Sequence, residues 1–407
     1  MILRTRKTNI RVLAGAVWSL SCFATISFAE KNDIQVKWKD GVRLETKDKS
    51  VQVRLGGRIQ YDFATMSQDS DIQQSFGSLQ DGTELRRARI YLSGVLREHV
   101  DFKAQYDFAG GLTKFKDVYI SLTGIPHLGK ITVGHMKEPF SLEELTSSNN
   151  ITFMERPLLV GFAPSRNVGV LISNHAKERV SWAIGIFRNT NDLGIGQGDG
   201  NFDFTGRLTG TPWLSEEGRQ VVHLGLSYSH RSPSDPSFRF SQRPEAHLTP
   251  RFVDTGTLLA QSANLVGPEF AWIQGPLSIQ TEYIYASLDP VTGNSKSNFQ
   301  GYYFLGSFFL TGEQRNYRAS EGRFRGIQPK NNFDISEKSV GAVEVAFRYS
   351  SLDLEDKSVT GGKLHDWTFG LNWYLNPNAR IMWNYVRADL DNVGTADILQ
   401  MRLQLNF

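Results

Sequence analysis

The chain has 407 residues, a formal net charge of +3 and a single cysteine, Cys22. Four cations and no carboxylates lie in residues 1–29, so residues 30–407 carry a charge of +3 − 4 = −1. This balance gives no basis for nucleic-acid binding. Without a cysteine, residues 30–407 have no disulfide framework, metal–thiolate site or cysteine nucleophile.

The N-terminal residues have the pattern of a secretory signal peptide. A basic stretch ends at Arg11, residues 12–28 are mostly apolar, and Ala29 completes a small-x-small cleavage motif with Ser27. The alternative, a membrane anchor, is disfavoured because the segment is short and interrupted by polar residues. No run of 18 apolar residues follows it. We therefore predict an exported protein that is cleaved after residue 29.

Segments of alternating apolar and polar residues follow one another to the C-terminus, and this period of two is typical of β-strands. An even number of strands places both termini on one side, as in bacterial outer-membrane barrels. We predict an all-β fold, a transmembrane antiparallel barrel of about 16 strands over residues 54–407, after a periplasmic lead-in at 30–53. The sixteen segments are 58–63, 86–94, 100–108, 117–124, 130–135, 167–174, 180–187, 202–210, 223–229, 268–274, 277–286, 302–310, 342–350, 366–375, 379–386 and 398–407.

The last segment is the most informative, because it alternates without a break and ends on Phe407. The last strand of a membrane barrel must be ordered, since it closes the sheet. A closing strand that ends in phenylalanine resembles the C-terminal signature of bacterial outer-membrane proteins.

The connections between these segments alternate in length, as expected for short periplasmic turns and long external loops. Residues 311–340 are an exception, because strand parity places this stretch of about thirty residues in the periplasm. It contains either an unrecognised hairpin or a large periplasmic loop.

The strand pattern also predicts which side chains face the lumen. A charge facing lipid at mid-depth costs ~2–4 kcal/mol, so the charged face should line a wet pore, and a barrel of this size can hold one. Eight cations and seven carboxylates are predicted to face inward: Arg58, Arg87, Arg89, Lys103, Arg207, Arg348, Arg380 and Arg402, and Asp62, Asp101, Asp107, Asp117, Glu282, Glu344 and Asp366.

Two loops could control the pore. Residues 137–157 are too long and too apolar to lie in solvent, so we expect this third external loop to fold into the barrel and narrow it. The alternative is a loop that packs over a trimer contact. Arginines are concentrated in residues 231–251, where their guanidinium forks suit phosphate oxygens, or could instead contact lipopolysaccharide phosphates.

A third basic cluster, Arg86, Arg87 and Arg89, begins the second strand. Arg87 and Arg89 should point inward, whereas Arg86 should point outward unless the strand is bulged there. These side chains either attract anions or form ion pairs with neighbouring carboxylates in the lumen.

Five motifs together resemble the phosphate-selective porin O and P family, at residues 41–62, 85–94, 137–144, 243–256 and 309–317. The resemblance implies a sixteen-stranded, homotrimeric porin in which loop arginines and lumen lysines lead anions to a central phosphate site. It places Arg239, Arg243 and Arg251 on the matching fifth external loop. It also matches Arg86 and Arg87 to an arginine pair near that site, with Lys137 as a further cation.

We therefore predict an outer-membrane porin for passive diffusion of small anions, with phosphate or polyphosphate as candidates. The near-equal numbers of inward cations and carboxylates favour an alternative, a general porin or one for organic acids or saccharides. No nucleophile, metal-ligand or nucleotide motif indicates an enzyme or a cofactor, and a structural barrel should have a plugged lumen. The predicted anion pathway is Arg58, Arg86, Arg87, Arg89, Lys103, Lys137, Arg239, Arg243 and Arg251.

Overall fold

The computed structural model describes residues 34–407 except 39–40, 199–201, 216 and 292–294. The predicted signal peptide therefore lies outside the described residues. None of the described helices is long and apolar enough to cross a membrane.

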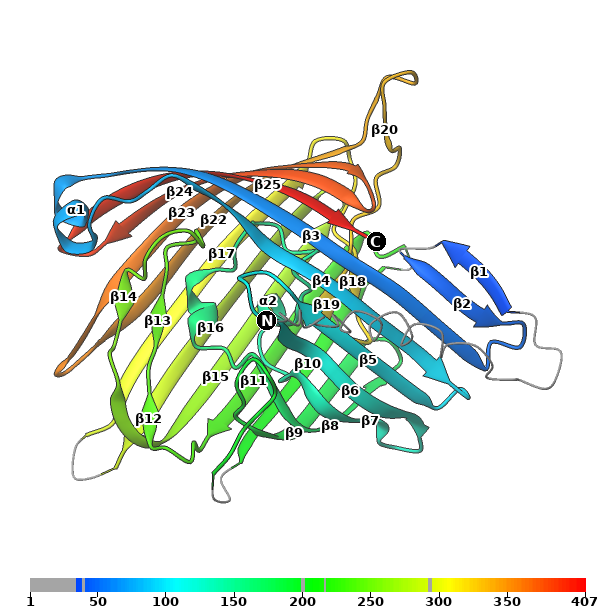
Figure 1. Cartoon of the computed structure of the whole chain (residues 1–407), viewed down its shortest axis with the longest axis horizontal. Helices are drawn as coiled ribbons and strands as arrows, with labels where there is room; N and C mark the ends of the chain where they lie inside the picture. The colour runs from blue at the N-terminus through cyan, green and yellow to red at the C-terminus, as the bar shows by residue number, and fades with distance from the viewer. Residues whose placement is uncertain (1–33, 39–40, 199–201, 216, 292–294) are drawn as a thin grey trace, which may run out of the picture.

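Sixteen long strands within the described ranges form a closed antiparallel barrel, as predicted (Figure 1). Each strand pairs with the next along the chain, and the last strand, β25, pairs with the first, β3. The strands are β3 (Val51–Gln68), β4 (Gly82–Leu96), β5 (Val100–Asp107), β6 (Lys114–Ile125), β7 (Gly129–Lys137), β8 (Arg166–Ala176), β9 (Val180–Arg188), β10 (Asp203–Leu214), β11 (Gln220–Arg231), β15 (Leu258–Gln274), β16 (Leu277–Pro290), β17 (Ser297–Phe309), β22 (Ala342–Asp356), β23 (Val359–Asn376), β24 (Ala379–Leu390) and β25 (Gly394–Asn406).

The C-terminal phenylalanine takes part in closing the barrel. The Phe407 amide donates to the Gly57 carbonyl at 3.1 Å, and the Gly57 amide donates back to the Phe407 carbonyl at 2.7 Å. The Phe407 ring lies directly over Gly57, where a β-carbon would come within 2.6 Å of it. Glycine is therefore required at position 57 for this close approach.

A short hairpin precedes the barrel at the end where the C-terminus lies (Figure 1). Its strands are β1 (Ile34–Trp38) and β2 (Val42–Thr46), and β2 pairs with the beginning of β3, with Val42 opposite Leu55. The hairpin thus extends the sheet past the end of β25 (Figure 1). The strand β3 itself begins at Val51, shortly before the expected boundary at residue 54.

The barrel wall has one apolar and one polar face, as the alternation predicted. On β3, Ile59 and Tyr61 are 45% and 38% exposed, whereas Gln60 between them and Arg58 and Asp62 on either side are buried inside the barrel. Trp367 on β23 is likewise exposed on the outer surface. The outer face suits lipid, and the inner face carries the charges.

The third external loop, residues 138–165 (loop 3), lies inside the lumen and confirms the predicted constriction. It contains the short helix α2 (Leu142–Leu145) and the 3-10 helix η1 (Leu158–Gly161). Figure 1 shows α2 within the ring of strands. The side chains of Phe140 and Phe153 are fully buried.

The fifth external loop, residues 232–257 (loop 5), packs against loop 3 on one side of the lumen. It contains β12 (Ser237–Phe238), β13 (Ser241–Gln242) and β14 (Val253–Asp254). Phe240 and Phe252 of loop 5 share an apolar core with Phe153 and Phe162 of loop 3 and with the inner faces of β15–β17 and β22–β24. The first external loop adds α1 (Ser70–Phe76), whose Phe76 stacks on Phe252 at 4.7 Å.

The long connection between β17 and β22, residues 310–341, is a large periplasmic loop that contains two hairpins. The first, β18 (Tyr317–Arg318) with β19 (Arg323–Phe324), lies inside the barrel, and Phe324 packs against Leu142 of loop 3. The second, β20 (Phe333–Asp334) with β21 (Ser339–Val340), projects away from the barrel (Figure 1). The alternation of apolar and polar residues did not reveal these strands, because each has only two residues.

Replacing Gly57 with alanine should destabilise the closed barrel, because the added methyl group would collide with the Phe407 ring and with the Arg89 carbonyl. We expect a loss of ~1–3 kcal/mol in the free energy of unfolding. The measurement is a urea titration in which gel electrophoresis separates the folded barrel from the unfolded chain by their different mobility. Gly306→Ala is the matched control, since a β-carbon there has no neighbour within 4 Å. Equal stability of the two variants would contradict the packing role of Gly57.

Candidate anion pathway

A cavity of about 630 Å³ lies in the lumen between loop 3 and the wall formed by the first strands. We call it the central cavity. Ten of the described residues that line it are cations, and one, Asp117, is a carboxylate. Charges of one sign around a cleft with low-dielectric walls raise the local concentration of the opposite ion. The ten cations are Arg54, Arg58, Arg87, Arg89, Lys103, Lys137, Arg156, Arg166, Arg323 and Arg325.

A second cavity of about 680 Å³ adjoins the first at the periplasmic end. We call it the periplasmic cavity, because residues next to the periplasmic turns, such as Gly129 and His175, line it. Lys103, Lys137 and Arg323 line both cavities. The two cavities therefore adjoin and share part of their cationic lining.

Arg58 is the most unusual cation of the central cavity. Its side chain donates from Nη1 to the Ser148 hydroxyl at 2.5 Å and from Nη2 to the Ser147 hydroxyl at 3.5 Å. Among the described residues, no carboxylate lies within ion-pair distance of this guanidinium, although the residue is only 7% exposed. Its Nε has no hydrogen-bond partner in the part of the chain that the structure describes. A buried cation in this state is costly unless an anion completes its surroundings.

Most lumen carboxylates are already bound to cations. Asp107 accepts from Arg89 at 2.6 Å, and Asp117 accepts from Arg166 at 2.7 Å while it also pairs with Lys103. Glu144 of loop 3 lies 2.9 Å from Lys137. These pairs use cations as well, but two cations often share one carboxylate, so the central cavity keeps an excess of positive charge. The nearly balanced lumen expected from eight inward cations and seven inward carboxylates is therefore not found on the lining of this cavity.

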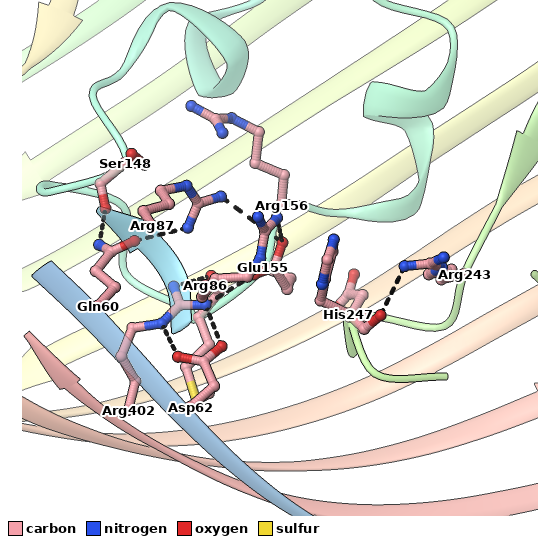
Figure 2. Close-up of polar contacts among 12 residues, drawn as sticks. Gln60, Asp62, Arg86, Arg87, Ser148, Glu155, Arg156, Arg243, His247 and Arg402 are labelled. Carbon is pink, nitrogen blue, oxygen red and sulfur yellow. Dashed lines mark hydrogen bonds and ion pairs between the residues drawn. The ribbon is translucent and has the colours of Figure 1, made fainter. Parts of the chain in front are cut away.

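Arg86 points inward because a β-bulge displaces it. Gln60 of β3 pairs with Arg87 and the next residue, Tyr61, pairs with Leu85, so Arg86 is the extra residue of the bulge. Both ends of its guanidinium donate to Glu155 of loop 3 at 2.8 Å (Figure 2). Arg86 therefore holds loop 3 and is not among the residues that line the two cavities.

Glu155 also joins loop 3 to the barrel seam. Arg402 of β25 donates to Asp62 of β3 at 2.6 Å and to Glu155 at 2.8 Å, and its side chain is fully buried (Figure 2). Arg87 bonds to Gln60 at 2.8 Å and lies 3.9 Å from Glu155, so it is the member of this group that reaches the central cavity.

The three loop 5 arginines are bound within their own loop. Arg239 forms a bidentate ion pair with Asp254, Arg243 donates to the His247 carbonyl at 2.6 Å (Figure 2), and Arg251 bonds to Ser241. None of the three is among the residues that line the two cavities. The hydrogen bond from Arg239 lowers the pKa of the Asp254 carboxyl.

Glu245 is a loop 5 side chain that binds the barrel wall through several contacts. It accepts from Arg348 on β22 at 2.9 Å and from the Ser350 and Thr368 hydroxyls. Both partners of the Arg348–Glu245 ion pair are fully buried, so this contact fixes loop 5 inside the lumen.

Five cations of the central cavity are absent from the predicted pathway. Arg54 and Arg166 precede the segments in which alternation was recognised, so longer strands would have revealed them. Arg156 lies in loop 3, next to Glu155. Arg323 and Arg325 lie in the periplasmic loop, where no strand pattern indicated that the chain returns to the lumen.

Residues 53–407 match the family described as phosphate-selective porin O and P. The chain belongs to this family. It is also 26% identical to Porin O of Pseudomonas aeruginosa over 431 residues, which covers 95% of each protein.

Solved structures have the same fold as this porin. An anion-selective porin from Comamonas acidovorans superposes with a TM-score of 0.58 at 12% identity, over 88% of this chain and all of that one. The trimer form of OmpT from Vibrio cholerae gives a TM-score of 0.55 at 10% identity, over 88% and 100% of the chains. The chain is thus an outer-membrane channel protein.

Substitution of Arg239 by glutamine tests whether loop 5 arginines guide anions. Because Arg239 is an exposed member of a surface ion pair, we expect its loss to leave the free energy of unfolding nearly unchanged. The conductance and anion selectivity in planar bilayers should match those of the wild type, and the pKa of Asp254 should rise. A marked fall in anion selectivity would show that Arg239 contributes to the anion pathway and would contradict this expectation.

Proposed function

We propose that this porin lets small anions diffuse across the outer membrane, with phosphate preferred, through the central and periplasmic cavities. The observation that carries this proposal is the position of Arg58, a buried guanidinium with serine partners and no carboxylate at ion-pair distance. A phosphate oxygen can accept from a guanidinium and from hydroxyl groups at once, and arginine suits this geometry because its donors form a fixed fork.

Further polar atoms support a hydrophilic ligand in the central cavity. Besides Arg58 Nε, three buried atoms on its lining have no hydrogen-bond partner among the described residues: Gln105 Nε2, Asn149 Oδ1 and Arg325 Nε. Such atoms are costly when they are left unpaired. Water or a permeating oxyanion would satisfy them, so the lining suits a solute that exchanges several hydrogen bonds as it passes.

The alternative is a general porin, or a porin for organic acids or saccharides. Its support was the near-equal number of inward cations and carboxylates, eight and seven. The lining of the central cavity does not have this balance, because ten of its described residues are cations and one, Asp117, is a carboxylate. A saccharide pore would need neutral hydrogen-bonding groups, and a cationic lining of this density instead favours anions.

For assembly, we propose a homotrimer, as in the trimer form of OmpT. We also propose that the signal peptide, residues 1–29, is cleaved after export.

We further propose that lipopolysaccharide surrounds the external half of the barrel. The exposed Arg239 and Arg251 of loop 5 are available for the phosphates of lipopolysaccharide.

Planar-bilayer recording tests the proposed selectivity. Under a KCl gradient we expect the zero-current potential to lie close to the chloride equilibrium potential, because the cationic lining concentrates anions and repels potassium. Added phosphate should then block the chloride current in a saturable manner. A cation-selective potential would contradict anion selectivity, and anion selectivity without block would contradict the preference for phosphate.

Substitution of Arg58 by glutamine should weaken phosphate block while the barrel stays folded. Glutamine removes a buried charge that lacks a carboxylate partner, so we expect little loss of stability. A hydrogen bond to a charged group contributes ~1.5–3 kcal/mol, so the apparent dissociation constant for phosphate should rise roughly ten- to hundredfold. Arg239→Gln is the matched control, and phosphate should block its chloride current at the same concentration as in the wild type. Unchanged block in Arg58→Gln would remove Arg58 from the binding site.

A further inference from the structure

The β18–β19 hairpin is held rigidly against the inner wall of the barrel. Arg207 of β10 donates to the Gly322 carbonyl at the hairpin tip at 2.7 Å. The backbone at Gly322 has a φ of 58°, and a β-carbon there would come within 2.6 Å of the Thr209 hydroxyl. Ala319 on the other side of the tip is buried. Glu321, which lies between Ala319 and Gly322 next to the latter, therefore has a fixed position in the lumen.

Glu321 lies at the centre of three guanidinium groups. Arg318 is 3.1 Å away, and Arg323 and Arg325 both form shorter ion pairs with the same carboxylate. These three arginine side chains are 37–56% exposed and Glu321 is 26% exposed, so water and solutes reach the cluster. With three cations and one carboxylate, the cluster keeps a net charge of about +2 at neutral pH.

The cluster lies where the two cavities meet. Glu321 and Arg318 line the periplasmic cavity, Arg325 lines the central cavity, and Arg323 lines both. An anion that moves between the two cavities therefore passes close to these arginines while they are bound to Glu321.

We propose that Glu321 acts as a built-in competing anion that speeds the release of permeating oxyanions toward the periplasm. This inference rests on the proposed anion channel. Conduction requires binding that is strong enough to admit an ion and weak enough to let it leave. The Glu321 carboxylate occupies part of the donor capacity of its arginines, so a permeating oxyanion binds there weakly and is displaced when the carboxylate re-forms its full set of ion pairs.

Asp117, the other carboxylate that lines these cavities, is less suited to this role. It belongs to β6 of the barrel wall, and its two ion-pair partners, Lys103 of β5 and Arg166 of β8, come from the same wall. Glu321 instead shares its partners between the two cavities. Removing its charge should leave the wall pairs intact and change the arginine cluster alone.

The test compares Glu321→Gln with the wild type in planar bilayers, with phosphate as the probe. The substitution raises the cluster from about +2 to about +3, so we expect phosphate to dissociate more slowly and to block chloride current at roughly tenfold lower concentration. Glu337→Gln is the matched control, because Glu337 is exposed on the β20–β21 hairpin that projects away from the barrel. In Glu321→Asp, which keeps the charge, phosphate should block the chloride current at the same concentration as in the wild type.

Two results would overturn the inference. Unchanged block in Glu321→Gln would mean that the carboxylate does not compete, and weaker block would mean that it only positions the arginines. If Glu321→Gln does not fold, Arg325→Gln gives the opposite test, because one cation fewer should weaken block and hasten release. Absence of phosphate block in the wild type would instead contradict the proposed phosphate preference, so the two failures are distinguishable.

Discussion

The arrangement of this porin depends on one buried guanidinium, that of Arg402. It binds Asp62 across the seam between the last and first strands, and it binds Glu155 of loop 3 at the same time. Breaking a buried ion pair by removing one partner costs several kcal/mol, because the other charge stays buried and unpaired. Barrel closure and loop position are therefore coupled energetically. A loop that is fixed to the seam can define a cavity of constant shape against the opposite wall.

The same requirement to pair buried charges explains the cationic cavity. Carboxylates on the wall and on loop 3 are taken up by Arg86, Arg89, Arg166 and Lys137, whose main task is to hold segments together. Because the central cavity has more cations than these carboxylates neutralise, a positive charge remains between loop 3 and the wall. Selectivity thus follows from which charges remain after the structure has been stabilised, and a count of inward residues along the strands cannot provide that information.

The period-two alternation was sufficient to predict the strands, their number and their two faces, because a one-residue shift would expose the charged face to lipid. The same pattern indicated that Arg86 could point inward only through a bulge, and the register at Gln60 confirms the bulge. The loop contacts could not be predicted, because they join residues far apart in the chain, such as Glu245 with Arg348. The return of residues 314–326 into the lumen also left no signal, since two-residue strands have no period to detect.

The lumen is divided into a dry half and a wet half. Apolar side chains of loops 3 and 5 fill the space along β15–β17 and β22–β24, so water-filled space remains along the β3–β9 wall. Three separate segments line that space: the wall itself, loop 3 and the β18–β19 hairpin. Only the wall is constrained by the hydrogen-bonded barrel, whereas loops tolerate substitution more readily. The solute that this fold admits can therefore change through loop 3 or the hairpin while the barrel, its closure and its lipid-facing surface stay the same.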